Sequence, residues 1–415
     1  MSPTTRTAAI LAAIALSALA VPTPVALAAA LALLGATGVD AAFARRSREV
    51  MRRAPDVLSR GVPEELRITA AAGSSRGLRG RQASPPDVDV EPAEGELPLS
   101  ARIVARRRGR QLLPPVATRS VGPLGLAAWH RQAAGRHEAR VYPDLPAARR
   151  IALAVRRSSF REQGVRGRGQ LGLGTEFELV RDYSPDDDVR QVNWLATARM
   201  GRPMSNEYRL EQDREVVAVI DSGRLMGAPV ESGTMLDAAI DALTAIAVVA
   251  DELGDRFGAL AFDAEIRRQL RPRRGGGARA VNALFDLEPT TLDSDYVRAF
   301  QQVEGSKRAF VVVFTDLLDE AAARSLIDGV PVLARRHAVT VASIADSELD
   351  RAVATPPADE LDAHRAAVAL DVLDARRRVT AKLVRAGAGV VEAPPGKLGP
   401  ACVRAYLKAK ARARL

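Results

Sequence analysis

Residues 215–222 read EVVAVIDS, an apolar run that ends in an aspartate and a serine. An uninterrupted apolar run of this length is typical of a strand buried on both faces of a parallel sheet. A second run, AFVVVF at residues 309–314, is followed by Thr315 and Asp316. These two stretches predict the fold class of the C-terminal half.

Apolar strands alternate with helical periodicity throughout residues 215–415. Strands are expected at 215–220, 257–262, 309–314, 339–344 and 389–391, and helices at 235–253, 278–285, 293–303, 320–335, 361–386 and 400–410. This alternation predicts an α/β domain with a doubly wound, mostly parallel sheet. Ligands of such sheets bind at the carboxyl ends of the strands.

The stretch before this domain, residues 169–199, reads GQLGLGTEFELVRDYSPDDDVRQVNWLATAR. It combines arginines, carboxylates and aromatic residues. Pairs between arginine and carboxylate groups favour a fixed hydrogen-bonded network. We interpret the stretch as a structural link between two domains, and the alternative is a surface that docks a partner.

The same stretch resembles the signature of the bacterial family called domain of unknown function 58. The matching residues are Gly172, Gly174, Glu176, Phe177, Arg181, Tyr183, Pro185, Asp187, Asp188, Arg190, Val192, Trp194, Ala198 and Arg199. Asp186 stands where the family prefers glycine. The resemblance implies a membrane-anchored protein with a von Willebrand factor A-like domain after the signature. It also implies a partner among MoxR-type AAA+ ATPases, and it implies no established reaction.

The carboxyl edge of the predicted sheet resembles the metal-ion-dependent adhesion site of von Willebrand factor A domains. Asp221 and Asp316 match its first and third loops, and Ser294 or Thr291 would supply the hydroxyl of the second. Two first-loop serines are replaced by Gly223 and Leu225. Mg²⁺ prefers about six oxygen ligands. We therefore expect a degenerate site of Asp221, Ser294 and Asp316 that holds Mg²⁺ or another divalent cation weakly, or holds none.

The same edge is the predicted surface for a protein partner. Its residues are Asp221, Ser222, Arg224, Ser294 and Asp316. Arg224 is expected to place a guanidinium nearby and to pair with Asp221 or Asp316, which would leave an ion-paired edge in place of a metal site.

The N-terminal residues 1–48 predict a membrane anchor. Apolar runs at 7–21 and 25–39 are separated by Pro22-Thr23-Pro24, and an arginine cluster follows them. A hairpin with Arg6 and the arginine cluster on the cytoplasmic side agrees with the positive-inside rule. The soluble body would then be cytoplasmic at the cell membrane. The alternative is a cleaved signal peptide.

Residues 49–150 predict a β-rich, sandwich-like module, with strands at 67–71, 88–91, 99–105 and 116–120 separated by turns. Gly122-Pro123-Leu124-Gly125-Leu126 and Val141-Tyr142-Pro143 resemble a segment of the same family, in which an acid normally stands at the position of Gly122. Residues 151–214 form the expected linker that carries the signature.

Composition excludes several function classes. The formal charge is +10, but the basic residues are mixed with acids and no nucleic-acid motif is present, so nucleic-acid binding is not expected. The single cysteine, Cys402, is expected to lie in the last helix. The four histidines lack metal-binding spacing, and no phosphate-binding loop occurs. Asp251, Glu252 and Asp255 are expected to face solvent, and residues 275–277 to form a flexible loop.

We therefore expect a non-enzymatic, membrane-anchored protein that binds a protein partner in a chaperone-like or envelope-related role. One alternative is a cell-surface adhesion protein, which requires the signal-peptide interpretation. The other is a metal-dependent hydrolase that uses Asp221 and Asp316, although nothing in the sequence supplies a nucleophile with its base.

Overall fold

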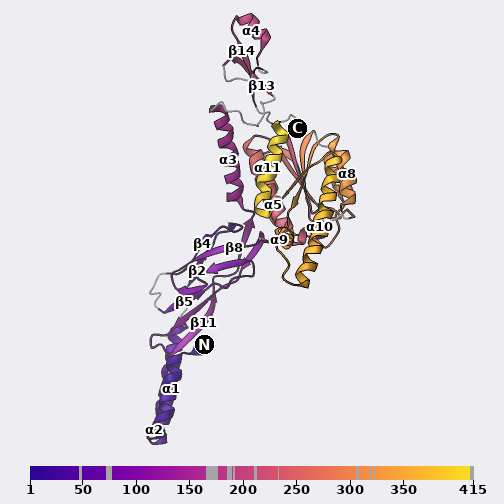
Figure 1. Ribbon diagram of the computed structural model, residues 1–415. Coiled ribbons are helices and arrows are strands. Elements are labelled where there is room, and N and C mark those ends of the chain that lie inside the picture. Colours follow the sequence, from indigo (N-terminus) through magenta and orange to yellow (C-terminus); the bar gives the residue numbers. More distant parts are fainter. Residues whose placement is uncertain are drawn as a thin grey trace. The chain divides into compact units, whose positions relative to one another are not determined.

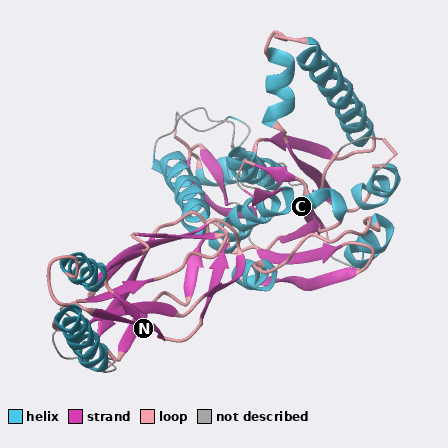
Figure 2. Ribbon diagram, turned by 90° about the horizontal axis from the view of Figure 1, so that it is seen from below, coloured by secondary structure: helices cyan, strands magenta, loops and turns pink. Residues whose placement is uncertain are grey.

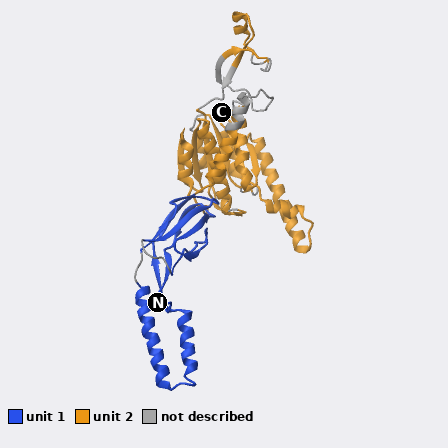
Figure 3. Ribbon diagram, turned by 90° about the vertical axis from the view of Figure 1, so that its left-hand side faces the viewer, with its two compact units in different colours: residues 1–141 blue, residues 142–415 orange. Residues whose placement is uncertain are grey.

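The chain folds into two compact units, Met1–Val141 and Tyr142–Leu415 (Figure 3). This computed structural model describes residues 1–45, 49–71, 77–164, 176–184, 189, 192–209, 213–231, 233–304, 308–317, 320–321 and 323–411. Each unit has its own core, and each is described separately below.

Unit 1 begins with two apolar helices, α1 (Thr5–Ser17) and α2 (Thr23–Ala44), which pack side by side (Figure 1). The chain reverses between them, and Pro22 and Pro24 lie at the start of α2, where the missing amide protons cost nothing. Helix α2 is long and apolar enough to cross a membrane, whereas α1 is shorter. The sequence pattern of two apolar helices separated by the prolines is therefore present.

The rest of unit 1 is built from antiparallel strands (Figure 2). One sheet has the order β1-β11-β10-β5-β7, the second β3-β12-β9 and the third β2-β4-β8-β6. Strands from all three sheets contribute apolar side chains to one core. The strands are β1 (Ser2–Pro3), β2 (Val50–Arg53), β3 (Val57–Ser59), β4 (Glu64–Ala70), β5 (Leu78–Arg81), β6 (Val88–Glu91), β7 (Glu94–Glu96), β8 (Leu99–Ala105), β9 (Gly109–Leu113), β10 (Val116–Val121), β11 (Ala127–Ala133) and β12 (His137–Tyr142).

Unit 2 is a mixed α/β structure around a six-stranded sheet with the order β19-β18-β15-β20-β21-β22. Five strands are parallel, and the edge strand β19 is antiparallel to β18. The sheet strands are β15 (Glu215–Asp221), β18 (Arg256–Phe262), β19 (Ile266–Arg274), β20 (Ala309–Phe314), β21 (Ala338–Ile344) and β22 (Gly389–Ala393). The predicted α/β class and its predominantly parallel sheet are confirmed.

Helices cover both faces of this sheet (Figure 1). Side chains alternate along β15, so that Val216, Ala218 and Ile220 enter one core and Val217 and Val219 enter the other. The first core is covered by α3 (Leu145–Gly164), α5 (Met235–Glu252), α6 (Gly276–Leu284) and α11 (Pro395–Ala411), and the second by α7 (Tyr296–Glu304), α8 (Arg324–Ala334) and α10 (Glu360–Arg385). Burial on both faces explains why the strands read as continuous apolar runs.

Short elements complete unit 2. The loop after β15 contains a 3-10 turn, η2 (Arg224–Gly227), and a two-stranded ribbon of β16 (Pro229–Val230) and β17 (Gly233–Thr234). Helix α9 (Ser347–Ala354) follows β21. The signature region holds β13 (Glu176–Asp182) paired antiparallel with β14 (Met204–Arg209), and α4 (Trp194–Met200) between them.

Two expectations about charged and glycine-rich segments are wrong. Asp255 does not face solvent: it is fully buried and accepts hydrogen bonds from Tyr406 and Lys410 of α11. The glycines at 275–277 do not form a loose loop, because α6 begins at Gly276 and Asp251 accepts from the Gly277 amide at 3.0 Å. Both aspartates satisfy groups that would otherwise be buried or left at a helix end.

Candidate functional site

The candidate site lies where the strand order of the sheet reverses. Strand β15 is first in the chain and lies in the middle, with β18 and β19 on one side and β20, β21 and β22 on the other. Ligands of open α/β sheets bind outside the carboxyl ends of the strands at such a reversal. Asp221 ends β15, and Thr315 and Asp316 follow β20, its direct neighbour. The predicted pairing of these two aspartates at one sheet edge is therefore present.

Asp221 is buried, and both of its carboxylate oxygens are occupied. Oδ1 accepts from the Gly223 amide at 2.8 Å and from the Ser294 hydroxyl. Oδ2 accepts from the Tyr296 and Thr315 hydroxyls, each at 2.8 Å. Four donors from four loop or helix positions hold this carboxylate in one orientation.

Tyr296 and Thr315 tie the network together beneath the surface. Their hydroxyl oxygens lie 2.6 Å apart, and both are buried. Burial, and then the nearby charge of Asp221, raise the pKa of Tyr296 well above its usual value. Tyr296 therefore stays protonated at physiological pH, so its hydroxyl remains a hydrogen-bond donor.

Asp316 is paired with an arginine that the sequence does not single out. Arg376 of α10 donates from Nη2 to Asp316 Oδ1 at 3.0 Å, and both side chains are 5% exposed. The same guanidinium donates to the Ile344 carbonyl at 3.1 Å. Burial raises the pKa of Asp316, and the positive charge of Arg376 opposes that rise. The pair is thus a buried ion pair that fastens α10 to the end of β20.

Arg224 does not make the predicted contact with Asp221 or Asp316. Its guanidinium pairs instead with Asp293, at 3.1 Å, and both side chains are exposed. Its amide donates to the Leu292 carbonyl at 2.8 Å, so the two loops run side by side. The expectation failed because Arg376 already neutralises Asp316 and hydroxyl donors already surround Asp221.

Ser294 occupies the space that a side chain at position 223 would need. A Cβ atom added to Gly223 would lie 2.2 Å from Ser294 Oγ and 2.9 Å from the Leu292 carbonyl oxygen. Of the two predicted hydroxyls, Ser294 contacts Asp221, whereas Thr291 is exposed. The loss of a serine at 223 is therefore matched by a serine from another loop.

A divalent cation does not fit these residues. The oxygens of Asp221 already accept four hydrogen bonds, and Asp316 already faces the fixed positive charge of Arg376. A cation would have to displace donors and approach a buried guanidinium, which costs far more than a weak site returns. Among the described residues, no group of three or more His, Cys, Asp or Glu is placed to hold a metal.

The five residues predicted to bind a partner differ in exposure. Asp221, Ser222 and Asp316 are buried, and the Ser222 hydroxyl donates to the Phe262 carbonyl at 2.9 Å. Ser294 is half-buried, and Arg224 is exposed. The surface above them is formed by Arg224, Leu292 and Asp293, and the Leu292 side chain is 50% exposed. We call these three residues the rim.

The signature residues do not belong to this edge: the described ones are in or beside the small β13–β14 sheet and α4. Glu176, Phe177 and Arg181 are in β13, Tyr183 follows it, and Val192 forms an isolated bridge to Ser205. Trp194, Ala198 and Arg199 are in α4, and Trp194 is 71% exposed. Gly172, Gly174, Pro185, Asp187, Asp188 and Arg190 lie outside the described residues.

One arginine–carboxylate pair joins the signature to the residues that follow it. Arg202 lies 3.2 Å from Asp182, and both side chains are exposed. Asn193 contributes more: its side chain accepts from the Ala196 amide at 2.9 Å and donates to Asn206 Oδ1 at 2.8 Å. It therefore caps α4 and joins that helix to β14.

Three residues of the site were missed by sequence reasoning. Thr315 directly precedes Asp316, and Tyr296 follows Ser294 by two positions, so a search around the predicted acids and hydroxyls would have found both. Arg376 carries no such signal, because it is the first of three consecutive arginines in a long helix. Only the packing of α10 separates it from its neighbours.

Comparison with known proteins identifies one family. Residues 179–380 match the model of the family described as Protein of unknown function DUF58. The matched range includes the second half of the signature, both aspartates of the sheet edge and Arg376. The match supports the family resemblance for this part of the chain. No curated protein matches the chain.

Proposed function

We propose, taking the DUF58 match of residues 179–380 as the premise, that this chain is a membrane-anchored, non-enzymatic protein that binds a protein partner. Its sheet, with helices on both faces and two aspartates at the point of reversal, supports a von Willebrand factor A-like domain. The apolar helix α2 supports anchoring in a membrane.

The observation that carries the proposal is the fixed network beneath an exposed rim. Both oxygens of the Asp221 carboxylate accept hydrogen bonds from groups within the protein, so this carboxylate is not free to act as a base or a metal ligand. What the network presents to solvent is Arg224, Leu292 and Asp293. A rigid base under an exposed arginine and leucine suits recognition of another protein.

The partner class comes from the family resemblance. That resemblance implies a MoxR-type AAA+ ATPase, and the rim is the surface that we assign to it. Arg224 and Asp293 pair with each other at the surface, where an ion pair contributes little to stability. Both groups are therefore available to exchange their internal pair for partner groups of opposite charge.

The test is a binding measurement with purified proteins. The full chain in detergent is immobilised, and a MoxR-type ATPase encoded in the same genome is titrated over it. We expect Arg224→Glu and Leu292→Asp each to weaken binding by about 10- to 30-fold, the size of a modest hot-spot effect.

Arg335→Glu is the matched control. Arg335 is an exposed arginine at the end of α8, which precedes β21 and therefore lies at the opposite, amino-terminal edge of the sheet. Its substitution should leave binding unchanged. If the ATPase does not bind the wild-type chain, or if Arg335→Glu weakens binding as much as Arg224→Glu, the proposal is wrong.

A further inference from the structure

The junction between the apolar helices and the β-module of unit 1 is built around Asp40 of α2. Its fully buried carboxylate accepts from the amides of Leu124, Leu126 and Ala127, at 2.8, 2.8 and 2.9 Å. Thr4 at the start of α1 donates to the Gly125 carbonyl at 2.6 Å. One loop, residues 122–127, therefore holds the module ends of both helices. The loop at residues 122–127 is therefore the end of the β-module that lies nearest to the apolar helices.

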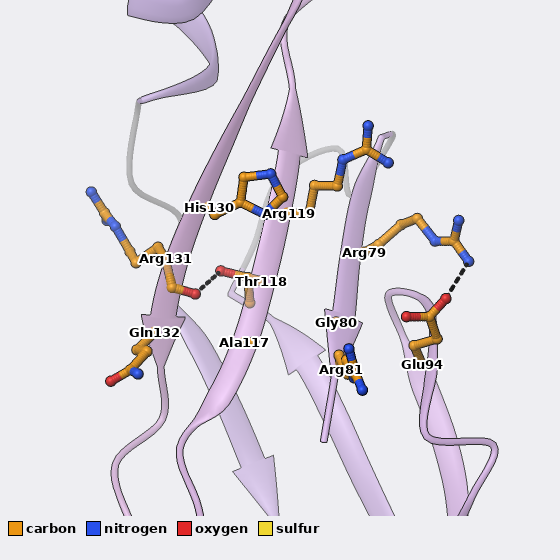
Figure 4. Close-up of a pocket in the computed structure, with 10 residues that line it drawn as sticks. All are labelled: Arg79, Gly80, Arg81, Glu94, Ala117, Thr118, Arg119, His130, Arg131 and Gln132. Carbon is orange, nitrogen blue, oxygen red and sulfur yellow. Dashed lines mark hydrogen bonds and ion pairs between the residues drawn. The ribbon is translucent and has the colours of Figure 1, made fainter. Parts of the chain in front are cut away.

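Beside this junction, three basic side chains stand in one row across three strands. Arg119 of β10 is in direct register with Arg79 of β5 and with His130 of β11. Directly opposed residues project from the same face of a sheet. Figure 4 shows the three side chains extending from their neighbouring strands. They line a depression of about 430 Å³, and we call them the basic row.

The basic row is only partly neutralised by the protein. Among the described residues, Arg119 has no ion-pair partner, and Arg79 has only a 3.6 Å contact with Glu94, with both side chains about half exposed. Glu96 faces Arg79 from β7, at the far side of the row from β11. Like charges directly opposite each other destabilise a sheet, so the Arg79–Arg119 neighbours favour an anion from outside.

The distance from the junction places the row at headgroup depth. Arg119 precedes Gly122 by three residues, which is about 10 Å along a strand. The headgroup layer adds roughly 5–8 Å to each side of the hydrocarbon core, and an arginine side chain spans the remainder. Leu124 at the tip of the junction loop is 57% exposed, as an apolar side chain that faces a bilayer would be.

Groups on the other face of the same strands agree with an interfacial position. Trp129 lies next to His130 in β11, and the Arg45 guanidinium sits 5.6 Å above its ring. The Ser120 hydroxyl donates to the Ala44 carbonyl at the end of α2, at 2.6 Å. Tryptophan and arginine are enriched at the level of lipid headgroups.

We propose that the basic row is a binding site for the phosphate group of anionic lipid headgroups, with Arg79 and Arg119 as its ligands. Arginine pairs with phosphate through two parallel N–H···O bonds, which suits two guanidinium groups over one depression. The proposal rests on the membrane anchoring put forward above but not on the protein partner.

Native mass spectrometry of the full chain in dodecyl maltoside tests the proposal by lipid titration. Phosphatidylglycerol and phosphatidylcholine are titrated separately, and both are phosphate lipids that differ in net charge. We expect tighter retention of phosphatidylglycerol. Each arginine near a surface is worth about fivefold in affinity, so Arg79→Gln/Arg119→Gln should reduce that preference by about 30-fold.

The matched control is Arg102→Gln/Arg140→Gln. Arg102 and Arg140 are exposed arginines on β8 and β12, in the other two sheets of the same module. This control should keep the wild-type preference. The single variant Arg119→Gln, which removes the unpaired arginine only, should lose about fivefold and guards against a folding defect in the double variant.

Three outcomes would overturn the proposal. The first is equal retention of the two lipids by the wild-type chain, and the second is an equal loss in the control variant. The third is micromolar binding of soluble glycerol phosphate in the absence of lipid, which would make the site one for a free phosphate compound. The ATPase is absent from these titrations, so their result is independent of whether the proposed partner binds.

Discussion

At position 223 the chain has no room for a side chain, so a serine cannot be accommodated there without moving the neighbouring loop. Restoring the serine that the adhesion-site pattern requires should destabilise the protein rather than create a metal site. Gly223→Ser would place Cβ against Ser294 Oγ and the Leu292 carbonyl. We expect a loss of about 1–3 kcal/mol in the free energy of unfolding, the usual cost of overpacking. Thermal unfolding of the full chain in detergent measures it.

Removing the obstructing side chain should reverse part of that loss. The double variant Gly223→Ser/Ser294→Gly exchanges the position from which the hydroxyl reaches Asp221. We expect its stability to lie between those of Gly223→Ser and the wild type. A Gly223→Ser single variant as stable as the wild type would show that the loops separate freely and that the network is not rigid.

Asp221 also allows a direct test of divalent cation binding. Because its four lone-pair directions are taken by donors, we expect titration calorimetry with Mg²⁺ or Mn²⁺ to show no binding at micromolar concentrations. Asp221→Ala serves as the reference for non-specific heat. Micromolar binding to the wild-type chain that disappears in Asp221→Ala would overturn the interpretation that a cation does not fit.

At position 122, too, a side chain from a distant part of the sequence occupies the space of a residue that the family pattern expects. The family segment normally has an acid there, and the sequence shows Gly122 in its place. A Cβ on Gly122 would lie 2.3 Å from the Asp40 carboxylate, which occupies that space. The departure at 122 is visible in the sequence. Its compensation is not, because Asp40 lies in the apolar N-terminal segment and only folding brings the two together.

At the scale of elements, the pair of Asp316 and Arg376 joins β20 to α10. Arg376→Met should cost about 3–5 kcal/mol in unfolding free energy, because it leaves Asp316 as an uncompensated buried charge. The double variant Asp316→Asn/Arg376→Met removes both charges and should be less destabilised than the single variant. Chemical denaturation of all variants forms a double-mutant cycle. Additive effects would mean that the two groups do not interact.

Helix α11 carries the single cysteine, Cys402, so the reactivity of this buried thiol reports whether α11 stays packed on the sheet. Burial raises the pKa of the Cys402 thiol from 9.0 to about 12. The native state therefore keeps this proton between those values while the unfolded state loses it, so the contribution to stability falls as pH rises through this range. At pH 8 we expect no reaction of the native chain with a maleimide and complete reaction in denaturant. Rapid labelling of the native chain would show that α11 detaches from the sheet.

The elements that the sequence predicts are those with a continuous or periodic apolar pattern. Strand β20 was expected at its observed bounds because both of its faces are buried. Strand β19 was not expected: residues 266–274 read IRRQLRPRR, and an antiparallel edge strand needs only one apolar face. Helix α3 was also not expected. Five arginines interrupt its apolar pattern, whereas its apolar residues Ala148 and Ala152 are buried in the core shared with α5.

The candidate site was predictable to a similar extent. Asp221, Ser294 and Asp316 could be placed at one edge, because the carboxyl ends of parallel strands meet there. The ion-pair partner of Asp316 could not be predicted. It comes from α10, at residues 360–385, and that helix contains several arginines with no sequence feature to distinguish them. A long arginine side chain can reach many possible partners, and the spacing of residues in the sequence does not show which of them it contacts in the fold.

At the scale of the whole molecule, the proposed membrane anchoring determines the compartment in which the surfaces of the chain would meet a partner. Helix α2 has 22 residues, which at 1.5 Å per residue is about 33 Å and matches a hydrocarbon core of about 30 Å. Thr4 and Asp40 hold the module ends of α1 and α2 at one loop, so in the proposed anchoring both helices leave the bilayer on the same side. The arginines that follow α2 favour the cytoplasmic side.

This topology predicts opposite accessibility for the hairpin tip and the body. In a Cys402→Ala background, Leu19→Cys places a thiol at the exposed turn between α1 and α2, and Ser100→Cys places one on strand β8 of the module. Intact spheroplasts are treated with a membrane-impermeant maleimide. We expect the Leu19→Cys variant to be labelled and the Ser100→Cys variant to be labelled only after permeabilisation. Labelling of Ser100→Cys in intact spheroplasts would place the body outside the cell, where the rim could meet only an extracellular ligand, and would favour an adhesion protein over a cytoplasmic partner of an ATPase.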